Sequence, residues 1–279
     1  MQMHILIVQD ISCVGRCSLL AALPVFNALG IRATPLPTAL LSSHTGFPGA
    51  VRRDLSEDMA AMLKHWQTLK LRFDAIHIGY LAGAQQLPII NEALSLLRQA
   101  DTRLFVDPVM GDWGRAYSYC DEALLAGFRA LCAQADVILP NRTEAAMLLD
   151  EPYSKGPDTP ASLLRQLKAL LTLGAKSAVM TGTNSQPGYT GAVCLGPGMP
   201  SPQAALTQEV KGSWPGTGDL FAAALEAALL KGRPLPAACE TAVRFIKKCL
   251  EQAEPDPKEA RYGAPFEEAL PWLIKELAD

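Results

Sequence analysis

Short apolar runs alternate with longer stretches of helical periodicity along most of this 279-residue chain. Alternation of this kind is typical of β-α units around a mostly parallel sheet with helices on both faces. We find no internal repeat, low-complexity segment or linker that divides the chain, so the pattern predicts one α/β domain over residues 1–279. The predicted strands are His4–Val8, Ala75–Ile78, Leu104–Val106, Val137–Leu139, Ala178–Met180 and Tyr189–Leu195.

Helix boundaries are marked by capping residues. Thr159-Pro160 predicts a helix start, because threonine caps well and proline suits the first helical position. Leucines then follow at helical spacing, and Gly174 marks the end. Glu122–Cys132 and Pro234–Gln252 are predicted to be helical in the same way. Residues 186–188 predict a turn between antiparallel strands, and residues 196–202 predict a surface loop.

Composition excludes several classes of protein. The formal net charge of −3 gives no basic footprint for nucleic acid. The longest apolar runs, such as Ala33–Leu41, are short and interrupted by prolines, so we expect no transmembrane helix. Met1–Leu6 is interpreted as the start of a strand rather than a secretory leader. Seven cysteines without a C-x-x-C pair favour reduced thiols in a cytoplasmic protein.

The most specific segment is Gly216-Thr217-Gly218-Asp219, which leads into an alanine-rich apolar helix. A glycine turn at a helix N-terminus presents backbone N–H groups and the positive end of the helix dipole, which suits a phosphate. Asp219 is placed to take a proton from a substrate hydroxyl that attacks this phosphoryl group. Taken alone, the segment equally favours a simpler role for Asp219 as a helix-capping residue.

Polar residues also follow several predicted strands. They are Asp10, the segment Asp107–Asp112, the segment Pro140–Glu144, and Thr181 with Thr183. Taken alone, Asn141 and Glu144 favour a helix cap with its partner three residues later. Because ligands bind beyond the carboxyl ends of parallel strands, we expect these groups to converge on one cleft. Asp107, Asp112 and Glu144 would then offer carboxylates to Mg²⁺ beside nucleotide phosphates.

Other catalytic motifs are missing from the sequence. There is no G-x-x-x-x-G-K-[ST], no G-x-G-x-x-G after the first strand and no G-x-S-x-G. The four histidines have neither metal-ligand spacing nor an evident nucleophile partner. These observations argue against a P-loop enzyme and a Rossmann dehydrogenase.

Three segments resemble the ribokinase-like superfamily of small-molecule kinases: Asp107–Asp112, Pro140-Asn141-x-x-Glu144 and Gly216–Asp219. Within it, Ser43–Phe47 and Ile78–Leu81 are similar to pyridoxal kinases, and the order of all five segments matches along essentially the whole chain. The resemblance implies a ribokinase-like fold, a homodimer, and phosphorylation of a vitamin B6 compound by ATP.

The resemblance also implies roles for the glycine turn. Asp219 would be the general base that faces the 5′-hydroxymethyl group of the B6 vitamer. The amides of Gly216, Thr217 and Gly218 would hold the migrating γ-phosphoryl group. Since the proton is transferred late in a loose transition state, Asp219 needs no raised pKa for this role.

Further roles follow from the same resemblance. Asp112 and Glu144 would serve Mg²⁺, while Asp107, Glu144 and Thr181 would line a site for a monovalent cation such as K⁺. Asn141 and Thr183 would lie near the ATP phosphates, and Thr45 and Tyr80 would contact the pyridine ring with His44 close by. Trp214 would border the nucleotide or the lip of the substrate pocket, although a core or surface position is equally favoured.

Two positions depart from the family pattern. Asp10 stands where these kinases commonly have a serine that contacts the polar edge of the ring, which suggests altered vitamer choice in favour of pyridoxamine. Leu139 replaces a threonine that is often found there, which predicts a weakened monovalent-cation site. Two alternatives stay open: a kinase for hydroxymethylpyrimidine or a related heterocycle, and a protein that binds B6 or nucleotide without turnover.

Overall fold

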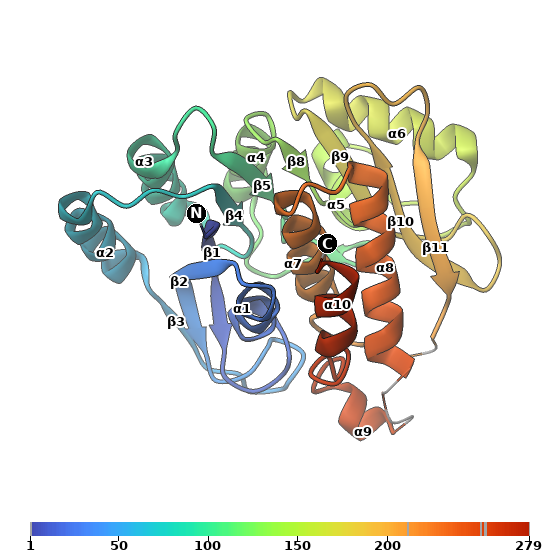
Figure 1. Ribbon diagram of the computed structural model, residues 1–279, viewed down its shortest axis with the longest axis horizontal. Coiled ribbons are helices and arrows are strands. Elements are labelled where there is room, and N and C mark those ends of the chain that lie inside the picture. The colour runs from blue at the N-terminus through green and yellow to red at the C-terminus, as the bar shows by residue number, and fades with distance from the viewer. Residues whose placement is uncertain (1, 211, 252, 254–255, 279) are drawn as a thin grey trace.

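A nine-stranded sheet runs through the molecule in the order β11-β10-β9-β8-β5-β4-β1-β2-β3 (Figure 1). The computed structural model describes residues 2–210, 212–251, 253 and 256–278. The strands are β1 (His4–Ser12), β2 (Arg32–Leu41), β3 (Arg52–Asp54), β4 (Ala75–Ile78), β5 (Arg103–Val106), β8 (Val137–Ile138), β9 (Ser177–Thr183), β10 (Tyr189–Leu195) and β11 (Gln203–Gln208). The six strands from β9 to β2 are parallel, and β3, β10 and β11 are antiparallel at the two edges. A small antiparallel pair, β6 (Gly111–Asp112) and β7 (Arg115–Ala116), lies outside this sheet.

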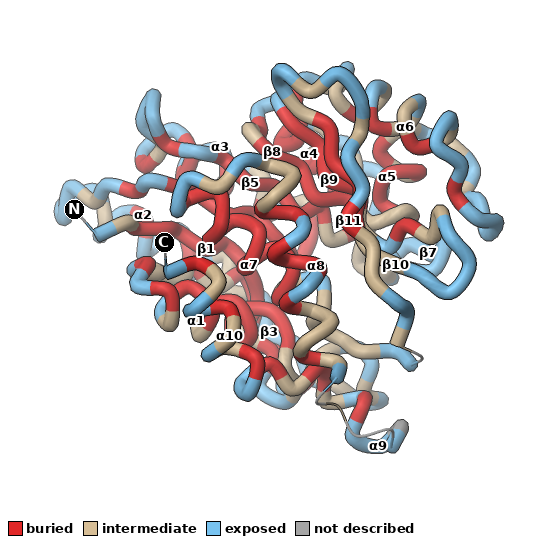
Figure 2. Tube along the Cα trace, turned by 45° about the vertical axis from the view of Figure 1, so that its right-hand side comes forward, coloured by how far each residue is buried: buried red, intermediate tan, exposed pale blue. Residues whose placement is uncertain are grey.

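Helices cover both faces of the sheet. They are α1 (Ser18–Ala28), α2 (Ser56–Leu69), α3 (Leu87–Leu97), α4 (Glu122–Cys132), α5 (Arg142–Leu149), α6 (Pro160–Thr172), α7 (Thr217–Leu230), α8 (Leu235–Glu251), α9 (Pro257–Ala260) and α10 (Leu270–Glu276), with a 3₁₀ turn at Ala84–Gln86. One apolar core joins α1, α7, α8 and α10 to one face, and a second core joins α2 to α6 to the other. Figure 2 shows α7 and the central strands as largely buried.

The predicted α/β architecture is confirmed, and several element boundaries agree closely with the prediction. Helix α4 and strands β4 and β10 have the predicted bounds. The predicted turn joins β9 to β10 as antiparallel neighbours, and Thr159 caps α6 with Pro160 in its first turn. Three strands are longer than predicted: β1 continues to Ser12, β9 extends over Ser177–Thr183, and β5 begins one residue earlier, at Arg103. Asp10, Thr181 and Thr183 therefore lie within strands, not after them.

Strand β2 occupies the proline-containing run that the sequence analysis did not identify as a strand. Pro35 and Pro37 pair in register with Ile7 and Gln9 of β1. On the other side β2 pairs with β3 only from Ala39 to Leu41, so within the described part of the chain no strand lies beside the prolines there. Proline lacks an N–H and is tolerated where that N–H would have no partner strand. The position of β2 in the sheet therefore allows a strand even though its prolines argue against one.

The chain changes direction across the sheet at β1. Strand β1 pairs with β2 on one side and with β4 on the other, and α1 lies on the opposite face from α2 and α3. In open α/β sheets such a switch point leaves a crevice beyond the carboxyl ends of the two strands, where ligands bind. Here the switch point lies at the carboxyl ends of β1 and β4.

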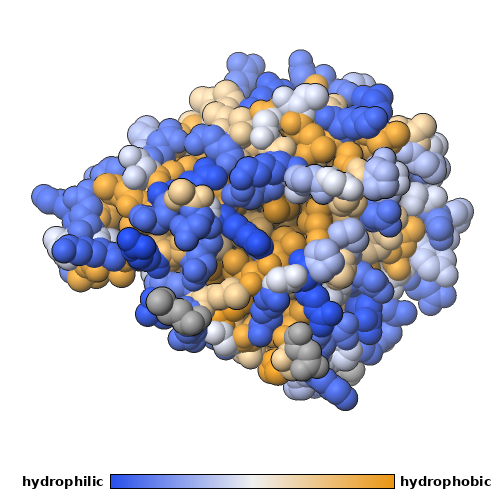
Figure 3. Space-filling view, turned by 45° about the horizontal axis from the view of Figure 1, so that its top comes forward, coloured by the Kyte–Doolittle hydropathy of each residue, from blue (hydrophilic) through white to orange (hydrophobic). Residues whose placement is uncertain are grey.

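The described part of the chain contains no helix that is long and apolar enough to cross a membrane. Hydrophilic residues predominate around the edge of the face in Figure 3, and apolar residues gather toward its middle.

Candidate active site

The glycine turn forms the N-terminus of α7. Gly216 is the N-cap residue and has a left-handed backbone with φ of 81°. A Cβ atom built on Gly216 would lie 1.9 Å from the carbonyl oxygen of Arg16, in the loop between β1 and α1. Only glycine fits this contact, which brings the start of α7 against the end of β1.

The first turn of α7 is suited to an anion. Gly216 has no side chain to cap the helix, and helix geometry leaves the first N–H groups without partners inside the helix. Gly218 is exposed, and no atom lies within 4 Å of the position where its Cβ would be. The Gly218 amide therefore lies at an open helix N-terminus, where the helix dipole favours a phosphoryl group, while the Thr217 N–H makes a long bond of 3.4 Å to the Trp214 carbonyl oxygen.

Asp219 is held by groups from two other elements. Its Oδ1 accepts a hydrogen bond of 2.5 Å from the Gln9 side-chain amide on β1, and its Oδ2 accepts one of 2.7 Å from the backbone N–H of Ser18. Burial raises the pKa of Asp219 to about 6, although the Ser18 N–H lowers it. The negative charge of Asp10 raises it further. The predicted mechanism did not require this raised pKa, but it brings the carboxylate closer in basicity to neutral pH.

Asp10 lies close to the same carboxylate. It is buried in β1, and its Oδ2 accepts a 2.8 Å hydrogen bond from the Ser12 hydroxyl. Burial raises the pKa of Asp10, and hydrogen bonds from Ser18 and Ser12 lower it. The cleft therefore contains two carboxyl groups with raised pKa values at the carboxyl end of one strand.

Asn141 and Glu144 form the helix cap that their spacing alone favoured. The Asn141 Oδ1 accepts from the backbone N–H groups of Thr143 and Glu144, and the Asn141 backbone N–H donates to Glu144 Oε2 at 2.8 Å. The Asn141 side-chain amide donates to the Gly111 carbonyl oxygen, and Glu144 Oε1 accepts from the Met110 N–H. Both side chains therefore join α5 to the segment after β5.

The carboxylates predicted to serve cations lie on this side of the cleft. Burial raises the pKa of Asp107, and burial with the nearby charge of Asp107 raises that of Glu144. Asp112 is exposed, and its Oδ1 accepts from the Trp113 N–H. Among the described residues, no three His, Cys, Asp or Glu side chains are arranged to hold a metal ion by themselves. Thr181, partly buried in β9, donates its N–H to the Pro140 carbonyl oxygen.

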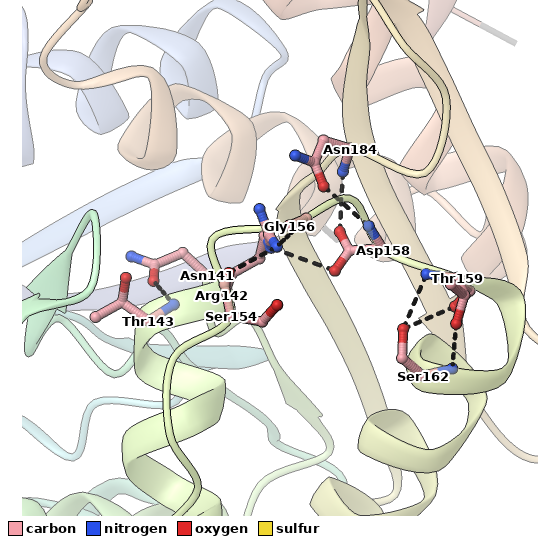
Figure 4. Close-up of polar contacts among 9 residues, drawn as sticks. All are labelled: Asn141, Arg142, Thr143, Ser154, Gly156, Asp158, Thr159, Ser162 and Asn184. Atoms are coloured by element: carbon pink, nitrogen blue, oxygen red, sulfur yellow. Dashed lines mark hydrogen bonds and ion pairs between the residues drawn. The ribbon is translucent and has the colours of Figure 1, made fainter.

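A polar cluster beside α5 fixes the end of β9 (Figure 4). Arg142 donates to the carbonyl oxygens of Ser154 and Gly156 and forms an ion pair of 3.3 Å with Asp158. Asp158 in turn exchanges two hydrogen bonds with Asn184. This cluster holds Asn184, the residue after Thr183. Thr183 itself is buried, and its hydroxyl has no hydrogen-bond partner in the described structure.

The residues predicted to contact the ring differ in exposure. Thr45 is exposed in the loop after β2, whereas Tyr80 is buried and its hydroxyl accepts a hydrogen bond from Arg52. His44 accepts from the Gly46 N–H through Nδ1, so its Nε2–H donates to the Arg261 carbonyl oxygen. Both ring nitrogens of His44 are therefore occupied by the protein itself.

Trp214 lies just before the glycine turn and is partly exposed. Its carbonyl oxygen accepts from the Thr217 hydroxyl at 3.0 Å, and its indole N–H is buried with no partner among the described residues. The residue thus supports the turn through its backbone.

Sequence reasoning missed three residues beneath Asp219. Gln9, His77 and Glu226 are buried, and His77 Nδ1 lies 2.7 Å from Glu226 Oε1. Glu226 gave one usable signal, because it is the single charged residue between Leu220 and Leu230 and lies seven residues, about two helical turns, after Asp219.

Comparison with known proteins supplies independent information. Residues 18–262 match the model of a family described as phosphomethylpyrimidine kinase. The pyridoxine/pyridoxal/pyridoxamine kinase of Bordetella avium is 30% identical over 237 residues, which cover 82% of this chain and 78% of that protein. Human pyridoxal kinase is 27% identical over 250 residues, with coverage of 81% and 77%.

Solved structures agree with these relatives. The pyridoxal kinase of Lactobacillus plantarum superposes with a TM-score of 0.88 at 33% identity, over 99% of this chain and 98% of that one. A protein of Bacteroides thetaiotaomicron, provisionally assigned as a phosphomethylpyrimidine kinase and crystallised with pyridoxal, gives a TM-score of 0.93 at 33% identity, over 98% and 96%.

Proposed function

Because this chain belongs to the phosphomethylpyrimidine kinase family and is related to the vitamin B6 kinases within the ribokinase-like superfamily, we propose that it phosphorylates a B6 vitamer with ATP. The acceptor is the 5′-hydroxymethyl group of pyridoxal, pyridoxine or pyridoxamine. The observation that carries the proposal is a carboxylate, Asp219, held by two donors at the open N-terminus of α7.

Asp219 acts as the general base. A bond forms between the substrate hydroxyl oxygen and the γ-phosphorus, while the bond from that phosphorus to the β–γ bridging oxygen breaks. The hydroxyl proton passes to the Asp219 carboxylate, and ADP is the leaving group. Since phosphoryl transfer passes through a loose transition state, alignment and charge stabilisation contribute most of the rate.

The N–H groups of Gly216, Thr217 and Gly218 bind the oxygens of the transferred phosphoryl group. Gly218 supports this role because the space around it is open. Donors fixed in the first turn of a helix need no reorganisation as charge develops on the phosphoryl oxygens. Asn141 and Thr183 lie near the other ATP phosphates, and Trp214 borders the nucleotide.

The carboxylates on the α5 side fit a cation that also binds nucleotide phosphates. Mg²⁺ is usually held through one or two carboxylates, water and phosphate oxygens, so the lack of a three-residue cluster among the described residues is compatible with it. Asp112 and Glu144 would hold Mg²⁺, and Asp107, Glu144 and Thr181 a monovalent cation. The raised pKa values of Asp107 and Glu144 support this proposal, because a cation between two buried carboxylates relieves their repulsion. When bound, Mg²⁺ supplies charge neutralisation to the phosphates.

Thr45, His44 and Tyr80 form the ring side of the site together with Asp10. A buried carboxylate favours a positively charged or hydrogen-donating group of the vitamer. We therefore propose that Asp10 shifts the choice toward pyridoxamine. In Asp10→Ser, the ratios of kcat/KM among the three vitamers should move toward pyridoxal and pyridoxine.

ADP release from MgATP tests the function, with pyridoxal, pyridoxine, pyridoxamine and hydroxymethylpyrimidine as acceptors. We expect turnover on at least one B6 vitamer. Asp219→Asn should lower kcat about 10²- to 10⁴-fold and leave the KM for MgATP nearly unchanged, since it removes the base but keeps the shape. If the Asn variant keeps its kcat within a few-fold, Asp219 is not the base.

A second candidate function is phosphorylation of a hydroxymethylpyrimidine, which the description of the matched family favours. Turnover on the pyrimidine alone would establish this activity with the same base. Nucleotide binding without ADP release on any acceptor would instead indicate a non-catalytic binding protein.

Two further proposals come from the resemblance and the cysteines. The protein is a homodimer, which sedimentation equilibrium would test. It works in the reducing cytoplasm, and the state of its seven cysteines supports this, because all are free thiols in the structure.

A further inference from the structure

Glu226 and His77 form a buried ion pair on the face of the sheet covered by α7. His77 lies on β4, next to Ile7 of β1, and its Nδ1 is 2.7 Å from Glu226 Oε1. Both side chains have almost no exposed surface. Burying such a pair is costly, and replacing it with apolar residues often stabilises a protein. A buried pair two turns below the base therefore calls for an explanation beyond stability.

Glu226 favours the charged form of His77. Burial disfavours an imidazolium, but the charge of Glu226 and its hydrogen bond outweigh burial and raise the pKa of His77. The other charged groups that face His77 are Asp107 after β5 and Asp219 on α7, and both also favour the imidazolium. With Nδ1–H donating to Glu226, a charged ring also carries a hydrogen on Nε2.

Gln9 lies between His77 and Asp219. A Cβ on Gly79 would be 3.0 Å from His77 Nε2 and 3.1 Å from Gln9 Cδ, so the ring and the amide lie against the same glycine. His77 Nε2 and Gln9 Oε1 are both buried without a hydrogen-bond partner in the described structure. When the ring is charged, His77 Nε2 is a donor and Gln9 Oε1 is an acceptor. The Gln9 Nε2, at the other end of the amide, donates to Asp219.

A charged His77 thus favours the orientation of the Gln9 amide in which the NH₂ faces Asp219. The two atoms form no hydrogen bond with each other, but a charged ring beside the amide favours its oxygen on the histidine side, which leaves the NH₂ toward the carboxylate. A neutral ring would present a lone pair at Nε2 and favour the flipped amide, whose oxygen would face Asp219 Oδ1 and repel it. Glu226 therefore influences the orientation of Asp219 indirectly, through His77 and Gln9.

We propose that Gln9, His77 and Glu226 form a positioning relay that fixes the orientation of the Asp219 carboxylate. Gln9 contacts Asp219 directly, and His77 and Glu226 act only through it, so all three are positioning residues. The inference rests on the proposed role of Asp219 as the base and adds residues that neither the sequence motifs nor the relatives indicated. Gly79 belongs to the device because a side chain there would separate His77 from Gln9.

The test is Glu226→Gln, which keeps the size of the side chain and removes its charge. We expect kcat to fall about tenfold while the KM for MgATP stays within twofold, because the base is misoriented and the nucleotide site is untouched. The acid limb of kcat/KM should also move to higher pH, since His77⁺ lowers the pKa of Asp219. A structural defect alone would leave that limb where it is. Unchanged kcat and an unchanged acid limb would overturn the relay.

Gln9→Met is a second variant, since it removes the amide and leaves the His77–Glu226 pair in place. It should give the same fall in kcat. The matched control is His4→Asn, at the opposite end of β1, where His4 is buried and bonded to Thr34 and the Arg72 carbonyl oxygen. This control should lose stability without moving the acid limb.

Ring-nitrogen NMR of the free protein gives a readout that does not depend on turnover. The chain has four histidines, and loss of one signal in His77→Asn assigns the ring. At pH 6.5, the ordinary pKa of histidine, we expect a mostly charged His77 in the wild type, because its pKa is raised, and a mostly neutral one in Glu226→Gln. A neutral ring in the wild type would overturn the relay even if the enzyme is active. Absence of turnover with a charged ring would instead refute the proposed function and leave the charged pair established.

Discussion

The N-termini of helices α7 and α5 share one sequence feature but differ in what bonds to their first N–H groups. Each has an acidic residue at its third position, Asp219 in α7 and Glu144 in α5. In α5 the N-cap is Asn141, whose side chain takes the amides of the first turn, while Glu144 bonds back to the N-cap. In α7 the N-cap is Gly216, which has no side chain, and Asp219 is bonded by β1 and the start of α1.

The difference shows that an acid in the first turn of a helix does not identify a catalytic site by itself. What separates the two termini is whether the cap residue satisfies the helix amides. When side chains of the helix itself accept hydrogen bonds from the first-turn N–H groups, few donors remain for a ligand. A helix that begins with glycine has no capping side chain, so its N–H donors remain available to an anion. The predictions below test this contrast.

Gly216→Ala should have the largest effect. The added Cβ meets the Arg16 carbonyl oxygen at 1.9 Å on a backbone with positive φ, so the start of α7 must move. Displacement of a catalytic group by about 1 Å can cost about a hundredfold in rate. We expect kcat/KM to fall by about this factor in a steady-state assay.

The matched control is Gly232→Ala at the other end of α7. Gly232 has φ of 87° but open space around it, so this variant adds backbone strain without a clash. It should cost about 1 kcal/mol of unfolding free energy and keep its activity. Equal losses of activity in both variants would show that the glycine turn has no special role.

The pH dependence of kcat/KM should report Asp219. The carboxylate must be ionised to accept a proton, and its pKa is raised to about 6. Activity should therefore fall about tenfold per pH unit below 6. Because the pKa of Asp219 in the folded protein lies above the ordinary value of 3.8, its contribution to stability increases as the pH falls, whereas activity decreases. It is fully present below pH 4 and is lost as the pH rises through 6. A flat activity profile down to pH 5 would contradict the assignment.

Asn141→Ala should have the smallest effect and test whether α5 serves only as structure. Loss of the cap should cost about 1 kcal/mol in a denaturant titration. Thr159→Ala removes the corresponding cap from α6, away from the site, at a similar cost. If Asn141 lies near the ATP phosphates, only its variant should also raise the KM for MgATP several-fold. Equal KM values would leave Asn141 with its capping role alone.

Local patterns were sufficient for most of the fold. The apolar runs predicted β4 and β10 at their observed bounds, and capping residues predicted the start of α6. The prediction missed β2, because its prolines are acceptable only where the strand lacks a neighbour on one side, and that depends on the position of β3. It also placed Asp10 after β1, although the strand continues to Ser12.

The sequence by itself determined the α/β architecture and the glycine turn with Asp219, because short-range sterics and periodicity fix a strand, a helix start or a turn from neighbouring residues. Only the tertiary structure decided which side chains surround that carboxylate. Gln9 reaches Asp219 across 210 positions of sequence, and His77 reaches Glu226 across 149. Such contacts depend on strand order and on how α7 packs over the sheet, and no local pattern carries that information.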